Sequence, residues 1–294
     1  MANRLSTEQR ARIVGCLVEG MSIRATVRAT GAAKNTIVKL LADLGAASTA
    51  FMDETLTDLE TKTVECDEIW SFCYAKAKNV PDEFKGTPGY GDVWTWVAID
   101  ADTKLVPSWL VGERTQDDAV VFMRDLASRL RYRVQITTDA LAIYRPAIAD
   151  AFGQDADFAQ LRKIYGDEVD GRRTYSPAKV MGCEIRVRTG DPDPDRISTS
   201  YVERQNLTMR MSMRRFTRLT NAFSKKFENH CHSLALYFVY YNWIRKHKAT
   251  GTTPAIAAGL TDKVLSFADL AQLMDEREET RKIRRREMFA KISN

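Results

Sequence analysis

Residues 61–72, TKTVECDEIWSF, carry the clearest structural signal in this chain. β-Favouring residues alternate at the start of the stretch and an aromatic-rich run closes it, which predicts a β-strand. Three acids, Glu65, Asp67 and Glu68, stand in the middle of this expected strand. Carboxylates are seldom buried unless they are paired or bound to a metal. The strand is therefore either an edge strand with a solvated acidic face or part of a site with partners elsewhere in the chain.

The elements that follow predict a mixed α/β fold. Residues 93–99 and 105–111 have the pattern of two further strands, and residues 116–130 have helical spacing. Residues 133–138, RVQITT, predict a short buried strand that runs into Asp139. Three strands, a helix and a strand ending in an acid is the opening order of a ribonuclease-H-like fold, with a right-handed crossover to a parallel neighbour.

In such a sheet the first and fourth strands are neighbours, so Asp67 and Asp139 are expected to meet. A helix that begins near Ser198 would bring Glu203 to the same place. Carboxylate oxygens gathered in this way suit Mg²⁺, with Mn²⁺ as a substitute. Two such ions activate an attacking oxygen and stabilise a leaving one. Asp67 and Glu68 point to opposite faces of a strand, so we expect only one of them to join the site, and position alone does not choose.

The helix that carries Glu203 has two further polar residues on the same face. Asn206 and Arg210 follow at spacings of three and seven. An arginine at this distance from a metal-binding acid can hold a substrate phosphate. The alternative for Glu203 is an acid in the first turn that interacts with the helix dipole. The positions expected to continue a basic, DNA-binding track along the helix are Arg214, Arg215 and Arg218.

The N-terminal region predicts three helices, over residues 7–19, 22–30 and 33–44, with Gly31 at a tight turn. Two short helices joined by a glycine turn are typical of the helix-turn-helix, whose second helix enters the DNA major groove. A three-helix bundle that binds no nucleic acid is the alternative. The outward residues expected to contact DNA are Lys34, Asn35, Thr36 and Lys39.

Charge is distributed unevenly along the chain, although the net charge is only +5. Residues 1–50 carry seven basic and three acidic side chains, and residues 203–226 carry seven basic and one acidic. The rest of the chain is net acidic. Two separate basic clusters indicate a polyanion partner, which we expect to be double-stranded DNA.

Composition also excludes several classes of protein. The chain has no apolar run long enough for a membrane span and no apolar N-terminal signal, so we expect a cytoplasmic, nucleoid-associated protein with no membrane partner. Five scattered cysteines and three histidines offer neither a disulfide framework nor a zinc site. No phosphate-binding glycine motif is present, so nucleotide-driven activity is not expected.

Four segments describe the expected domain organisation. Residues 1–50 form the helix-turn-helix domain, and residues 51–60 fall in a small, polar stretch with the composition of a linker. Residues 61–250 form the catalytic domain. Residues 251–294 form a helical, charged tail. Within the catalytic domain we expect an edge strand over 158–164, an inserted hairpin over about 167–198 and a long helix over 223–248; the tail is expected to contain a short helix near 266–274.

Several long motifs resemble one protein family. They are VECDEIWSF, GERT at residues 112–115, TTDALAIY at residues 137–144 and SYVERQNLTMRMSMRRFTRLTNAFSKKFENH. Together they are similar to transposases of small bacterial insertion sequences, of the insertion-sequence-one type, over residues 63–260. The resemblance implies a retroviral-integrase-like catalytic domain of the Asp-Asp-Glu class. Carried over to this chain, the catalytic and metal-binding triad falls on Asp67, Asp139 and Glu203, which selects Asp67 over Glu68.

The resemblance also implies roles for Asn206, in the family's ERxN motif, and for Arg210 at the basic position after it. Two features depart from the family pattern. Other members have a cysteine zinc finger before the helix-turn-helix, which this sequence lacks, and the segment between Asp139 and Glu203 is longer than in compact members. Recognition of DNA ends would then depend on the helix-turn-helix and the basic helix alone.

The sequence therefore predicts a Mg²⁺-dependent transposase that cleaves DNA at element ends and joins the freed 3′ hydroxyl to target DNA. Because two ends must be paired, a homodimer is the smallest assembly expected. A nuclease on the same fold would cut without joining. A DNA-binding regulator whose catalytic site has been retired is the non-enzymatic alternative.

Overall fold

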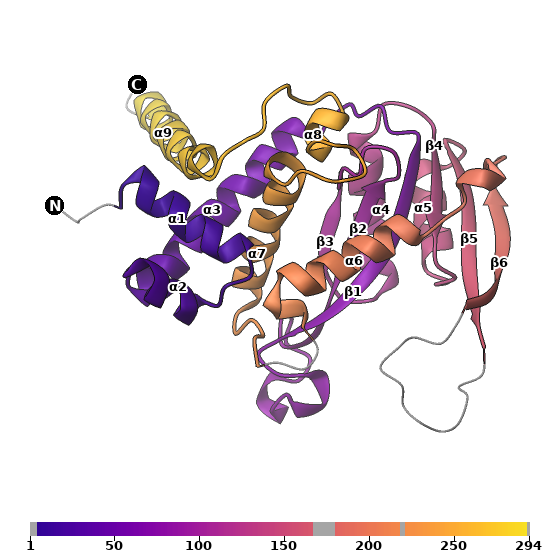
Figure 1. Ribbon diagram of the computed structural model, residues 1–294, viewed down its shortest axis with the longest axis horizontal. Coiled ribbons are helices and arrows are strands. Elements are labelled where there is room, and N and C mark those ends of the chain that lie inside the picture. The colour runs from indigo at the N-terminus through magenta and orange to yellow at the C-terminus, as the bar shows by residue number, and fades with distance from the viewer. Residues whose placement is uncertain (1–4, 167–179, 218–220, 293–294) are drawn as a thin grey trace. The chain divides into compact units, whose positions relative to one another are not determined.

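The computed structural model describes residues 5–166, 180–217 and 221–292 (Figure 1). The chain divides into two units: residues 1–57, 70–94 and 207–294 form the first, and residues 58–69 and 95–206 form the second. This division differs from the expected one, because the region expected to be catalytic contributes to both units.

The first unit begins with three helices at the positions that the sequence indicates. They are α1 (Thr7–Val18), α2 (Ile23–Thr30) and α3 (Lys34–Thr55). Ser6 and Gln9 form a reciprocal capping box at the start of α1. Ser22 caps α2, and Gly31 ends it with φ of +72°, in the left-handed region that favours glycine.

Helix α3 extends beyond its predicted end. Residues 45–55, whose small and polar composition predicted irregular chain and the start of a linker, are helical. The reason is packing against α7 (Phe227–Val239). A Cβ atom at Gly45 would lie 2.4 Å from the His232 Cβ atom, so only glycine allows this approach. Tertiary packing therefore overrides the weak local helix preference of this stretch.

The C-terminal part of the first unit also differs from expectation. Helix α7 ends at Val239 and continues as a π-helical turn over residues 240–244, so the predicted helix over 223–248 is shorter. Helix α8 (Pro254–Ala257) and helix α9 (Phe267–Ile292) follow. The predicted short helix of the charged tail is the start of α9. Arg10 of α1 donates two hydrogen bonds, of 2.7 and 2.8 Å, to the Asp275 carboxylate of α9. Among the described residues, no helix is both long and apolar enough to cross a membrane.

A six-stranded mixed sheet with the order β3-β2-β1-β4-β5-β6 runs through the second unit. Strand β1 pairs with β4 in parallel, β4 pairs with β5 in parallel, and β5 pairs with β6 antiparallel. The expected pairing of the first and fourth strands is thus present. The strands are β1 (Thr63–Cys73), β2 (Gly91–Asp100), β3 (Trp109–Gly112), β4 (Val134–Thr138), β5 (Ala156–Tyr165) and β6 (Val180–Thr189).

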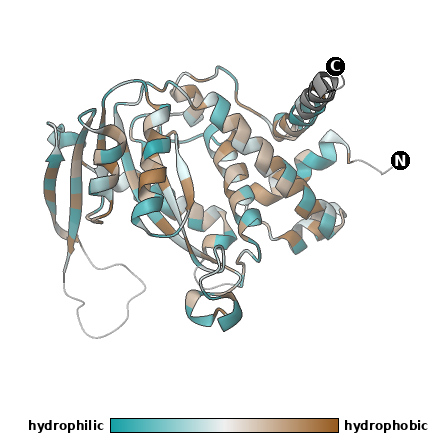
Figure 2. Cartoon of the chain, turned by 180° about the vertical axis from the view of Figure 1, so that it is seen from behind, coloured by the Kyte–Doolittle hydropathy of each residue, from teal (hydrophilic) through white to brown (hydrophobic). Residues whose placement is uncertain are grey.

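Helices α4 (Gln116–Arg129) and α5 (Tyr144–Phe152) pack on one face of this sheet. Their apolar sides meet Trp96, Ile136 and Phe158 in a buried core. Figure 2 shows the corresponding alternation of hydrophobic and hydrophilic residues along the helices. Residues 64 and 66 of β1 belong to this core, so the odd-numbered residues of the strand face the other way.

Strand β5 is not the expected edge strand, because β6 pairs with it along its length and occupies the edge. Strand β6 is the described part of the insertion expected over 167–198, together with a 3₁₀ turn over Pro194–Arg196. Residues 167–179 of that insertion lie outside the described residues.

Candidate active site

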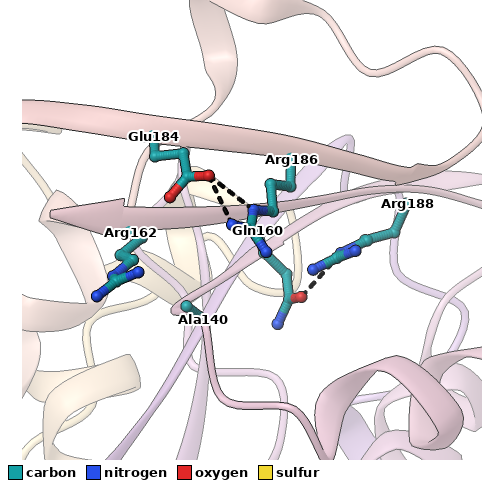
Figure 3. Close-up of a pocket in the computed structure, with 6 residues that line it drawn as sticks. All are labelled: Ala140, Gln160, Arg162, Glu184, Arg186 and Arg188. Carbon is teal, nitrogen blue, oxygen red and sulfur yellow. Dashed lines mark hydrogen bonds and ion pairs between the residues drawn. The ribbon is translucent and has the colours of Figure 1, made fainter.

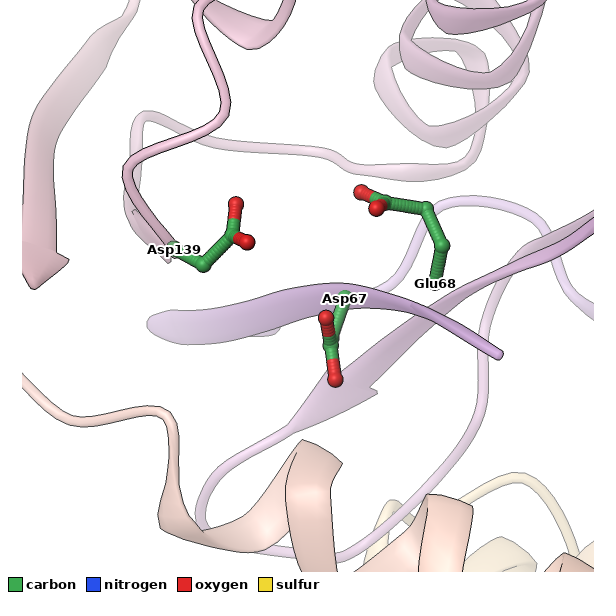
Figure 4. A group of neighbouring side chains, drawn as sticks. All are labelled: Asp67, Glu68 and Asp139. Atoms are coloured by element: carbon green, nitrogen blue, oxygen red, sulfur yellow. The ribbon is translucent and has the colours of Figure 1, made fainter. Parts of the chain in front are cut away.

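Three carboxylates meet at one end of the central parallel strands. Asp67 and Glu68 belong to β1, and Asp139 directly follows β4. One oxygen from each of the three lies within 4.8 Å of the others (Figure 4). Residues that leave parallel strands at the same edge are brought together by the pairing itself. We call Asp67, Glu68 and Asp139 the acidic group.

The expectation that only one of the two adjacent acids joins the site stays a prediction, because oxygens of both acids lie near Asp139. Figure 4 shows the Asp67 and Glu68 side chains on opposite sides of the β1 ribbon, as strand geometry requires, with Asp139 beside the strand. Because Asp139 lies next to the strand, oxygens from both faces of β1 come within reach of it. The geometry therefore leaves both Asp67 and Glu68 able to act with Asp139.

Arg114 partly balances the charge on the Glu68 side. Its Nε atom donates a 3.0 Å hydrogen bond to Glu68, and an Nη2 atom lies 4.0 Å from the Asp139 carboxylate. The buried Tyr144 hydroxyl lies beside Glu68 but outside hydrogen-bonding geometry. A single arginine thus faces two of the three carboxylates.

A tight turn before α4 holds Arg114 in place. Thr115 caps α4 by accepting a hydrogen bond from the Asp118 backbone, and the Asp118 carboxylate accepts one from the Glu113 backbone. A Cβ atom at Gly112 would lie 2.8 Å from that carboxylate, so a larger residue there would have to displace the Asp118 side chain. This turn is the GERT motif of the sequence.

Burial and mutual repulsion raise the pKa values of two members of the acidic group. Loss of solvent raises the pKa of Asp67 to about 6, with repulsion by Asp139 as the next cause. Burial raises the pKa of Glu68 to about 7, and its acidic neighbours add to the effect. Like charges held together out of water cost free energy unless a cation compensates them.

The third acid of β1, Glu65, has a structural role that the sequence did not indicate. Its carboxylate accepts hydrogen bonds from the backbone nitrogens of Tyr201 and Val202, at 2.7 and 3.0 Å. These are free donors in the first turn of α6 (Ser200–Ser212). A buried carboxylate therefore fastens the start of α6 to β1.

This anchor brings two predicted site residues of α6 to the sheet. Asn206 donates a 2.8 Å hydrogen bond to the Asp67 carboxylate. Glu203 is not part of the acidic group: both its oxygens lie 2.5 Å from the Lys163 ammonium of β5, and Thr199 donates a 2.8 Å hydrogen bond to it. Repulsion by Glu203 nevertheless contributes to the raised pKa of Asp67, so the two carboxylates are near each other.

The donor set fits a hard divalent cation. All the available groups are oxygens, which Mg²⁺ and Mn²⁺ prefer. Glu68 Oε1 and Asn206 Oδ1 are buried and have no hydrogen-bond partner among the described residues. Buried polar atoms without partners are costly, and a bound cation or its water ligands would satisfy them.

Most of the described residues that were predicted to contact DNA are exposed to solvent. Lys34, Asn35, Thr36 and Lys39 are exposed on the first turns of α3, where Lys39 pairs with Asp43. Arg210 lies on α6 in the first unit, and Arg214 is exposed in a 3₁₀ turn. Arg218 lies outside the described residues.

Arg215 is turned inward. It donates hydrogen bonds to Ser233 at 2.8 Å and to Ser224 at 2.9 Å. Its burial lowers its pKa, which marks a desolvated guanidinium. The basic pattern of the sequence indicated a DNA contact here, whereas this arrangement gives Arg215 a structural role.

Sequence reasoning missed Arg114, Gln160 and Lys163, which act on Glu68, Asp139 and Glu203 respectively. Arg114 was present in the GERT motif without an assigned role. Lys163 and Gln160 lie on β5, and only the strand order shows that β5 is next to β4. No local pattern in the sequence contains that information.

No protein-family description and no curated protein sequence matches this chain. The resemblance to the insertion-sequence-one type therefore stays a prediction. Solved structures give distant similarities. A Mos1 strand transfer complex has 10% identity and a TM-score of 0.33, with 94% of this chain and 78% of that chain covered. A piggyBac transposase synaptic complex with hairpin DNA has 11% identity and a TM-score of 0.36, with 95% and 75% covered. These similarities are too distant to carry an argument, so function has to be inferred from the site.

Proposed function

We propose that this protein is a metal-dependent DNA transposase of the Asp-Asp-Glu class, which cleaves DNA at element ends and joins the 3′ hydroxyl to target DNA. The observation that carries the proposal is the acidic group at the end of β1 and β4, with partner-free buried oxygens around it. The parallel pairing of β1 with β4 in the order β3-β2-β1-β4-β5 supports the ribonuclease-H-like character of the sheet.

Asp67, Asp139 and Glu203 are the proposed catalytic triad. Asp67 and Asp139 would hold a divalent cation, with Mg²⁺ favoured and Mn²⁺ as a substitute, and Glu203 and a second ion would complete the site. Bound ions of this kind lower the pKa of an attacking oxygen and stabilise the leaving one. Asn206 orients Asp67 through its amide, while Lys163 and Thr199 keep the Glu203 carboxylate at the start of α6.

DNA recognition is proposed for the helix-turn-helix of α2 and α3. The exposed side chains of Lys34, Asn35, Thr36 and Lys39 are suited to phosphates and base edges. Arg210 and Arg214 are proposed to contact further DNA phosphates. Because two element ends react together, the working form is proposed to be a homodimer or a larger assembly.

A strand-transfer assay on DNA that carries the element's own ends tests this proposal. With Mg²⁺, the wild-type chain is expected to release a 3′ hydroxyl and to join it to a second duplex. Asp67→Asn and Asp139→Asn should bind the same DNA and cleave it at least about a hundredfold more slowly. Cleavage without joining would indicate the nuclease alternative. DNA binding with no metal-dependent chemistry would indicate the regulator.

A further inference from the structure

A second polar site lies on the β5–β6 hairpin. A cavity of about 310 Å³ opens there, next to the residue that follows Asp139 (Figure 3). Five of its six lining side chains are polar or charged, which makes it unsuited to an apolar ligand. The lining residues are Ala140, Gln160, Arg162, Glu184, Arg186 and Arg188.

The strand register places the charged side chains of this cavity on one face. Gln160 is opposite Arg186, and Arg162 is opposite Glu184. Directly opposed residues share a face of the sheet. Arg188, at a register shift of the strand pair, lines the same cavity and hydrogen-bonds to Gln160. Three guanidinium groups therefore face one carboxylate. We call Arg162, Arg186 and Arg188 the arginine face.

Among the described residues, Arg186 is the one arginine of the three that hydrogen-bonds to an acid, although Arg162 and Arg188 also help to lower the pKa of the Glu184 carboxyl. Arg186 donates hydrogen bonds of 2.9 and 2.7 Å to Glu184 and holds the pKa of that carboxyl below its usual range. Arg188 donates a 3.0 Å hydrogen bond to the neutral Gln160 amide oxygen. Arg162 lies opposite Glu184 across the strand pair and interacts with that carboxylate through its charge. Three arginines and one glutamate line the cavity, so its lining has a net positive charge that the ion pair with Glu184 does not neutralise.

Gln160 connects the arginine face to the acidic group. Its amide nitrogen donates to the backbone oxygens of Asp139 and Leu141, both at 3.0 Å, while its amide oxygen accepts from Arg188. One side chain thus fixes both the loop that carries Asp139 and an arginine of the neighbouring cavity. The Gln160 amide therefore fixes the position of the cavity relative to the loop that carries Asp139.

The geometry points to a phosphate-binding subsite: we propose that the arginine face binds a backbone phosphate of the DNA strand, next to the phosphate that reacts at the acidic group. This inference rests on the proposed function and adds to it the place where the flanking strand is held. Guanidinium groups match phosphate oxygens with paired hydrogen bonds. The arginine-rich, polar lining of the cavity therefore suits the anionic phosphate group better than an apolar group.

Binding of the full chain to a fluorescein-labelled duplex of random sequence, in EDTA and at several salt concentrations, tests the inference without requiring catalysis. The double variant Arg162→Ala/Arg188→Ala is expected to bind about tenfold more weakly at low salt, and the slope of log K against log[salt] should fall by about one to two. The charge-keeping variant Arg162→Lys/Arg188→Lys should keep most of that slope.

Arg124→Ala is the matched control. Arg124 is an exposed arginine on α4 that pairs with Asp150. If the double alanine variant matches this control in affinity and in salt slope, the phosphate subsite is ruled out. Equal melting temperatures for the variants and the wild-type chain confirm that the folded state is compared.

The strand-transfer assay separates this inference from the proposed function. For the double alanine variant we expect a higher half-saturating DNA concentration and a nearly unchanged rate at saturation. An unchanged half-saturating concentration together with a normal reaction overturns the subsite and leaves the transposase proposal standing. If the wild-type chain binds DNA in the expected salt-dependent way but performs no chemistry, the transposase proposal fails and the binding data still decide the subsite.

Discussion

Two buried polar clusters of this molecule differ in how well their groups are satisfied. In the first unit, His230 lies between two hydroxyls, with Ser71 Oγ 3.2 Å from Nε2 and Ser224 Oγ 3.0 Å from Nδ1. Ser71 donates to the Val93 carbonyl, and Arg215 donates to Ser224. The hydrogen-bond directions assign the imidazole proton to Nε2. In the second unit, the acidic group holds like charges together and leaves Glu68 Oε1 without a partner.

The difference separates a structural cluster from a binding site. Burial, followed by repulsion from Arg215, lowers the pKa of His230 to about 3, so the ring is neutral and its network is complete. Burial raises the pKa values of Asp67 and Glu68, so their charged forms are destabilised until a cation arrives. Both clusters contain perturbed ionisable groups. Of these two clusters, only the acidic group has a buried polar atom without a hydrogen-bond partner. Such an atom indicates a binding site better than a shifted pKa does.

Asp139→Asn is expected to have the largest effect and tests whether the acidic group is a binding site. We expect DNA cleavage to fall by about a hundredfold to a thousandfold, because a proposed metal ligand loses its charge and its shape is kept. The melting temperature without metal should stay the same or rise, since repulsion with Asp67 is relieved. Single-turnover cleavage and thermal melting on the same preparations measure both. A large loss of stability would place Asp139 in the structural class with His230.

His230→Ala should have the opposite profile. Both serine hydroxyls lose their partner and a cavity opens, so we expect a loss of about 2–3 kcal/mol in the free energy of unfolding. Activity per folded molecule should stay close to that of the wild type. Urea unfolding followed by cleavage under native conditions tests this. If cleavage collapses while stability is retained, His230 takes part in function and the comparison breaks.

The pH dependence of stability gives a third test. The unfolded chain protonates His230 near its ordinary pKa of about 6.5, whereas the folded chain does so only near pH 3. Below pH 6.5 the unfolded state therefore binds more protons, and stability is lost as the pH falls from 6.5 towards 3. The contribution of His230 at pH 5 is a loss of about 2 kcal/mol relative to pH 7.

The acidic group contributes to the pH dependence of stability with the opposite sign. Carboxyls whose pKa is raised take up protons preferentially in the folded state, so they favour folding as the pH falls. The test is therefore a difference between the wild-type chain and His230→Asn, which cancels the contribution of the acidic group. We expect the wild type to lose more stability than the variant between pH 7 and pH 5. Parallel curves for the two proteins would mean that His230 is not buried as a neutral ring.

Glu68→Gln has the smallest expected effect. Glu68 is paired with Arg114, and Asp67 is the ligand in the proposed triad. We expect cleavage to fall by about tenfold, the lower end for residues that support a metal site. Comparison with Asp67→Asn in the same assay decides between the two. Equal losses would make Glu68 a full member of the site.

Much of this site was predictable from sequence, because topology rules act on strands that periodicity can locate. The pattern of β1 and β4 and the right-handed crossover were enough to bring Asp67 and Asp139 together. The ion pair between Lys163 and Glu203 was not predictable, since it depends on β5 being next to β4. The capping of α6 by Glu65 is a contact between distant segments, for which the strand pattern gives no signal.

The helix boundaries show the same limit. The end of α2 at Gly31 follows from a local backbone requirement and was predicted. The length of α3 depends on the close approach of Gly45 to His232, which no local composition can reveal. The small residues of 45–55 predict a linker when their packing partner is unknown. The end of α2 was predictable because a local backbone requirement sets it, whereas the end of α3 depends on a contact with α7 that local composition does not indicate.

Calorimetric titration of the protein with Mn²⁺, in the absence of DNA, tests the central claim most directly. The wild-type chain should bind Mn²⁺ at the acidic group, and Mg²⁺ should compete for the same site. The double variant Asp67→Asn/Asp139→Asn should lose this binding while keeping the fold, and His230→Asn should bind as the wild type does. Equal Mn²⁺ binding by the wild type and the double variant would contradict the assignment of the acidic group as the metal site.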